Sequence, residues 1–106
     1  MAKIANHKID AHISALAPFI NYNGTIVADR KEGLYEVWHW STKIFTYNIN
    51  TGEIVYLVPS SISQTTSTLV GRIVRNIPRQ SLVKWLMDCP DLTAYNRKRF
   101  VRMARL

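Results

Sequence analysis

The sequence predicts one α+β domain with an N-terminal helix, an antiparallel meander of three or four strands, and two to three C-terminal helices. Three observations indicate this fold class. The chain is 106 residues long and 47% hydrophobic, which suits a single domain with one core over residues 1–106. Its middle alternates β-branched and aromatic stretches with short turns, and its last third shows helical periodicity.

A first helix is predicted over about residues 8–17. Ile9, Ile13 and Leu16 follow one another at spacings of four and three, which places them on one helical face. Pro18 limits this helix, because proline lacks the amide hydrogen that a helix interior requires.

The strands are predicted after a turn at residues 21–24, where asparagine and glycine tolerate positive φ angles. Alternation in the second strand places Tyr35 and Val37 on one face and Glu36 and Trp38 on the other. Glu36 shares its face with Trp38 and Trp40, so one of the two faces must be partly solvated, and the pattern leaves open which one. Short segments that suit hairpins separate the four predicted strands, which cover residues 25–28, 34–40, 43–49 and 53–58.

A second helix follows a stretch rich in serine and threonine. Ser63 or Thr65 is expected to cap its N-terminus, and Pro78 ends it, because the residue before a proline is disfavoured in helical space. Arginines fall on the side opposite to its apolar stripe, so the helix is amphipathic. The apolar stripe consists of Leu69, Val70, Ile73, Val74 and Ile77.

Two further helices are predicted near the C-terminus. One covers about residues 80–87. Asp91 is expected to cap the other, in which Lys98, Arg102 and Arg105 recur at spacings of four and three.

The positive charge of the protein is confined to its last third. Residues 1–71 hold five cationic and five acidic side chains, whereas residues 72–106 hold nine and two and so carry the whole formal charge of +7. Such a field attracts polyanions over a Debye length of about 8 to 10 Å, which favours nucleic acid or an acidic protein surface as the partner. A solvated polar face is the alternative, but it normally mixes both signs. The candidate contacts are Arg72, Arg75, Arg79, Lys98, Arg102 and Arg105.

Aromatic residues on neighbouring strands are candidates for base stacking. Trp38, Trp40 and Tyr47 lie on two predicted strands, an arrangement on which unpaired bases stack in sheet-based RNA readers. The alternative is that these side chains form the core of the sheet.

Enzymatic and metal sites are not expected. His7, His12 and His39 lack a second histidine, thiol or carboxylate at metal-binding spacing, and Cys89 is the single cysteine. The sequence has no glycine-rich phosphate loop or nucleophile elbow. We therefore expect no catalytic residue, no metal and no cofactor. With no apolar run of about 18 residues and no signal peptide, a cytoplasmic location without membrane contact is expected.

Three short motifs point to a group of proteins. The hairpin segment 40–44, the Thr-Gly turn in 50–53 and the Thr-Thr helix start in 63–67 resemble small, uncharacterised bacteriophage proteins that share these features. The resemblance covers about residues 34–77. It implies a phage-encoded accessory protein, active in the host cytoplasm, and carries no residue roles with it.

Two functional hypotheses follow. The first is a non-enzymatic accessory protein that binds nucleic acid or a nucleoprotein through its basic helical face, by neutralising phosphates. The second is a phage-encoded inhibitor of a host defence protein, similar in style to anti-CRISPR proteins, which docks the same residues on an acidic protein surface. A homodimer is compatible with both. Reversing the charges of Arg72 and Arg75 should then weaken binding and leave the melting temperature nearly unchanged.

Overall fold

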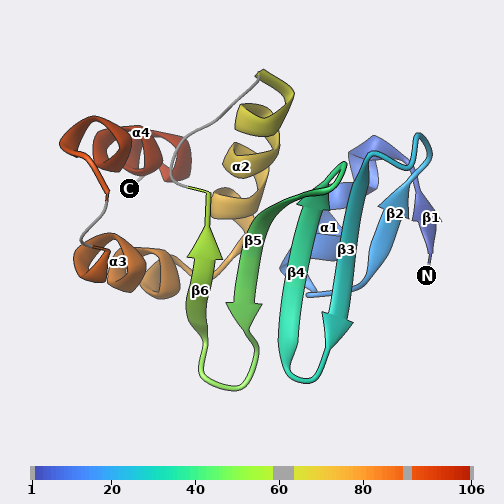
Figure 1. Cartoon of the computed structure of the whole chain (residues 1–106), viewed down its shortest axis with the longest axis horizontal. Coiled ribbons are helices and arrows are strands. Elements are labelled where there is room, and N and C mark those ends of the chain that lie inside the picture. Colours follow the sequence, from blue (N-terminus) through green and yellow to red (C-terminus); the bar gives the residue numbers. More distant parts are fainter. Residues whose placement is uncertain (1, 59–63, 90–91, 106) are drawn as a thin grey trace.

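A computed structural model describes residues 2–58, 64–89 and 92–105 of the chain. It is an α+β structure with one six-stranded sheet, as Figure 1 shows. The elements in chain order are β1 (Lys3–Ile4), the 3₁₀ helix η1 (Asn6–Lys8), α1 (Ile9–Ser14), β2 (Phe19–Asn21), β3 (Ile26–Lys31), β4 (Leu34–His39), β5 (Thr42–Asn48), β6 (Glu53–Leu57), α2 (Gln64–Asn76), α3 (Arg79–Asp88) and α4 (Ala94–Ala104).

The sheet is larger than the sequence predicts. Its strands lie in sequence order, and every neighbouring pair is antiparallel except β1 and β2, which are parallel. The α+β class and the C-terminal helices are confirmed, but the sheet has six strands where the sequence predicts three or four. β1 and β2 escape prediction because they have only two and three residues and are defined by their pairing with one another. The first helix is also shorter than expected, because Leu16 adopts a positive φ of 52°.

The structure decides which sheet face is buried. A row of paired residues that crosses the sheet lies entirely in the core: Phe19, Ala28, Val37, Phe45 and Leu57. The same face meets the helices, because the ring of His39 contacts Thr66 of α2 and the hydroxyl of Tyr47 contacts Ser81 of α3. Trp38 and Glu36 lie on the opposite face, which is partly exposed.

The helices pack through the apolar stripe that the sequence predicts for α2. Leu69, Val70, Ile73 and Val74 are all buried. Figure 1 shows α1 behind β3 and β4, while α3 and α4 lie beyond β6, and α2 packs against both α1 and α4. The predicted cap Thr65 lies inside α2, because the helix already includes Gln64.

The start of α4 also differs from the prediction. Ser63 and Asp91, two of the expected caps, lie outside the described residues. The N-cap of α4 is Thr93, whose Oγ1 accepts a hydrogen bond of 3.1 Å from the backbone amide of Asn96. The helix is anchored by Phe100, which is fully buried and packs edge-to-face on Trp85 with ring centroids 5.2 Å apart.

Candidate functional site

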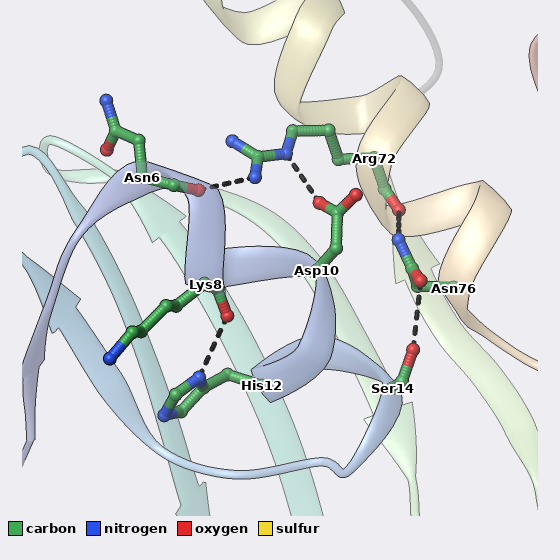
Figure 2. A network of polar contacts seen from close by, with 7 residues as sticks. All are labelled: Asn6, Lys8, Asp10, His12, Ser14, Arg72 and Asn76. Atoms are coloured by element: carbon green, nitrogen blue, oxygen red, sulfur yellow. Dashed lines mark hydrogen bonds and ion pairs between the residues drawn. The ribbon is translucent and has the colours of Figure 1, made fainter.

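Arg72 is held inside a polar network rather than presented to a partner. Its Nε donates a hydrogen bond to Oδ1 of Asp10 at 2.6 Å, and its Nη2 donates to the backbone carbonyl of Asn6, also at 2.6 Å. Figure 2 shows the guanidinium reaching from α2 across to the segment that holds η1 and α1. The charge of Arg72 is therefore neutralised by a carboxylate from the N-terminal half of the chain.

The same network continues along α2. Asn76 donates to the backbone carbonyl of Arg72 at 2.8 Å and accepts from the hydroxyl of Ser14 at 2.9 Å, so α1 is tied to α2 at both of its ends (Figure 2). Reversing the charge of Arg72 should consequently lower the melting temperature. This prediction replaces the expectation from the sequence that reversing the charges of Arg72 and Arg75 together leaves the melting temperature nearly unchanged.

Arg75, one helical turn later, faces a different neighbour. Its Nη1 lies 3.5 Å from the backbone carbonyl of Met103, in the last turn of α4, and the side chain is exposed. The guanidinium lies against Gly71, where a Cβ would come within 3.1 Å of Nη1. Arg75 therefore adds its charge to the C-terminal end of α4.

Helix α4 and its C-cap carry five cations, none of which forms an ion pair with a described residue. The ion pairs among the described residues are Lys43–Glu36, Arg72–Asp10 and Lys84–Glu53, and none involves α4. The exposed side of the helix and its C-cap present Lys98, Arg102 and Arg105. We call these three residues together with Arg75 the cationic surface.

Two other arginines of α4 point toward the protein. Nη2 of Arg97 donates to the backbone carbonyl of Cys89 at 3.3 Å. The guanidinium of Arg99 lies over the ring of Phe100 at 5.5 Å, and its Nε and Nη2 are buried with no hydrogen-bond partner in the described part of the chain. Neither arginine forms an ion pair with a carboxylate within residues 2–58, 64–89 and 92–105, so both add to the positive field of the helix.

Arg79 lies apart from Arg72 and Arg75, because it belongs to α3 and not to α2. It is the first residue of α3 and lines an open cleft of about 640 Å³ together with Val83, Lys84 and Met87. A hydrogen bond to Glu53 raises the pKa of Lys84, so this neighbouring cation is already paired. The side chain of Met87 is 77% exposed, which gives the cleft an apolar wall.

The three candidate stacking residues occupy three different environments. Tyr47 is only 5% exposed and stacks on Phe45, so it belongs to the core and is not available to a base. Trp38 lies on the outer face of the sheet, where the ammonium of Lys43 sits 5.3 Å from its ring. Trp40 is 68% exposed in the turn between β4 and β5. None of the three lies on α4.

An aromatic residue that the sequence analysis misses accompanies the cationic surface. Tyr95, in the first turn of α4, is 76% exposed. It precedes Lys98 by three residues and Arg102 by seven, so the three side chains share one helical face. The helical spacing is the signal that could have found it.

Comparison with family models, with curated proteins and with solved structures found no match. Within residues 2–58, 64–89 and 92–105, no three histidine, cysteine, aspartate or glutamate side chains are grouped so as to hold a metal ion. No helix in these ranges is long and apolar enough to cross a bilayer. The functional proposal therefore rests on the positions and contacts of the side chains described above.

Proposed function

We propose that the protein is a non-enzymatic nucleic-acid-binding protein whose cationic surface on α4 contacts phosphates. The observation that carries this proposal is the absence of any ion pair on α4 among the described residues, although the helix and its C-cap hold five cations. Guanidinium and ammonium groups form charge-assisted hydrogen bonds with phosphate oxygens, which neutralise phosphates with little reading of sequence.

The spacing of the cations supports this proposal. Like charges three or four residues apart on a helix destabilise it by about 0.2–0.5 kcal/mol per pair. Lys98 and Arg102, four residues apart in α4, form one such pair, and neither has an ion-pair partner among the described residues. A bound polyanion relieves this repulsion. A helix face with mixed charges has no such repulsion to relieve.

A second candidate is the inhibitor of a host defence protein, which docks on an acidic protein surface. The observation in its favour is the cleft on α3, where exposed Val83 and Met87 lie beside Arg79. Methionine and arginine are enriched in protein interfaces, whereas phosphate backbones make little use of apolar contact. Under both candidates the protein acts as a phage-encoded accessory factor in the host cytoplasm.

The test is the salt dependence of binding to short DNA and RNA duplexes, measured by fluorescence anisotropy. If the four residues of the cationic surface each contact a phosphate, the slope of log K against log salt is about −3 to −4, from about −0.9 per contact. The double variant Lys98→Glu/Arg102→Glu should reduce the magnitude of the slope by about 2.

A matched control changes the net charge equally at another place. Lys8→Glu/Lys31→Glu alters two exposed lysines of the N-terminal half, and it should leave the slope nearly unchanged. Equal losses of affinity in both double variants would mean that net charge alone attracts nucleic acid. A complex with one host protein that survives nuclease, with no affinity for free nucleic acid, would favour the inhibitor instead.

A further inference from the structure

A second cleft lies at the end of the sheet, between the turns before β3 and before β5 and the first turn of α2. It has a volume of about 540 Å³ and no residue of α4 lines it. This volume lies within the range of about 300–1,000 Å³ that small-molecule sites occupy. The residues that line it are Asn23, Thr25, His39, Trp40, Thr42, Thr65 and Thr66.

Trp40 offers the cleft a large exposed ring. Its side chain is 68% exposed, and its backbone is fixed in the turn by a hydrogen bond of 2.7 Å from its amide to the carbonyl of Thr25. The backbone of Trp40 is therefore fixed at the cleft, while its side chain stays largely exposed. An aromatic ring in this position can cover one face of a planar ligand.

His39 supplies a buried polar group on the same cleft. It is 8% exposed, and its Nδ1 lies 3.1 Å from Oγ1 of Thr66. Nε2 has no hydrogen-bond partner in the described part of the chain. His39 is thus a lining residue of the cleft in which Thr66 engages one of the two ring nitrogens.

We propose that this cleft binds a neutral nucleobase, either in a free nucleoside or in an unpaired nucleotide of a strand. The base stacks on Trp40, and its hydrogen-bonding edge meets His39, Asn23 and the hydroxyl of Thr42. None of the described residues that line the cleft is an aspartate, glutamate, lysine or arginine, which favours an uncharged ring with donors and acceptors over a phosphate or a carboxylate. The site is separate from the cationic surface and does not depend on it.

The test is a titration of the labelled protein with adenosine, cytidine, guanosine and uridine, followed by the indole N–H signals in a nitrogen–proton correlation spectrum. The signal of Trp40 should shift saturably with at least one nucleoside, while those of Trp38 and Trp85 stay in place. Trp40→Ala should weaken binding by roughly 5- to 150-fold, which corresponds to the loss of one stacked base. Tyr22→Ala is the control, because Tyr22 is also exposed at the β2–β3 turn and does not line the cleft.

Three further arms decide the outcome. Nucleoside binding should persist in high salt and in Lys98→Glu/Arg102→Glu, so that its failure is distinguishable from failure of the proposed phosphate contacts. An unpaired oligonucleotide that shifts Trp40 when free nucleosides do not would identify the base of a strand as the ligand. The absence of a saturable Trp40 shift with all of these probes, or an equal shift with glucose, would overturn the proposal.

Discussion

Replacing Arg72 with methionine should loosen the attachment of the N-terminal segment to α2. Methionine keeps an apolar chain of similar length and removes both hydrogen bonds of the guanidinium, to Asp10 and to the carbonyl of Asn6. The rest of α2 keeps its apolar stripe. The substitution therefore isolates the polar network that joins η1 and α1 to the helix.

The size of the effect follows from exposure. The side chain of Arg72 is 21% exposed and that of Asp10 is 48% exposed, so solvent screening limits their ion pair to about 1 kcal/mol. The hydrogen bond from a charged donor to Asn6 adds about 1 kcal/mol, below the usual range of about 1.5–3 because this contact is exposed. A total of about 2 kcal/mol corresponds to a melting temperature lower by roughly 8–16 °C.

Thermal and urea unfolding measure this effect. A double-mutant cycle with Asp10→Asn and Arg72→Met should give a coupling energy of about 1 kcal/mol, because the two side chains are in direct contact. Arg75→Met is the matched control on the same helix. It should change the unfolding free energy by less than about 0.5 kcal/mol, as for most exposed positions.

Two results would refute this reasoning. Equal destabilisation by Arg72→Met and Arg75→Met would mean that the network does not distinguish the two arginines. A coupling energy near zero would mean that Asp10 and Arg72 do not interact in solution. At a temperature where the variant is folded, Arg72→Met should also bind nucleic acid with the same salt slope as the original protein.

Two further predictions concern a helix cap and a buried hydroxyl. Thr93→Ala should lower the unfolding free energy by about 1 kcal/mol, because the backbone amide of Asn96 loses its acceptor at the start of α4. Thr93→Ser keeps a hydroxyl at the cap and should retain most of the unfolding free energy. Equal losses in the two variants would show that the cap is not formed. Burial raises the pKa of the Tyr35 hydroxyl, which donates to the carbonyl of Ala17, so the unfolded chain ionises first and stability falls above pH 10.0. The difference in unfolding free energy between the original protein and Tyr35→Phe, measured by urea unfolding, should shrink above pH 10.0. A difference that stays constant with pH would contradict this prediction.

The sequence predicts those elements that form through local periodicity and turns. Strands β3 to β6 follow from alternation and from turns such as the one at Glu32 and Gly33, where both φ angles are positive. Strands β1 and β2 could not be predicted, because the pairing of Lys3 with Ile20 joins residues far apart in the sequence. Short strands of this kind carry no periodicity of their own.

The site was predictable in its charge and not in its contacts. Helical periodicity treats Arg72 and Arg75 alike, since both lie opposite the apolar stripe of α2. Only the packing of α1 on α2 brings Asp10 to Arg72, across 62 residues of sequence. The cleft beside Trp40 could not be predicted from the sequence either, because its lining comes from the β2–β3 and β4–β5 turns and from α2.

Tertiary structure explains why the cations of α4 have no ion-pair partner among the described residues. Carboxylates of the N-terminal half reach the neighbouring helices, since Asp10 pairs with Arg72 of α2 and Glu53 with Lys84 of α3. The remaining described ion pair, between Glu36 and Lys43, lies within the sheet. α4 packs on α2, and no described carboxylate reaches it. The five cations of α4 and its C-cap thus create a positive field along one helix, and such a field attracts a polyanion.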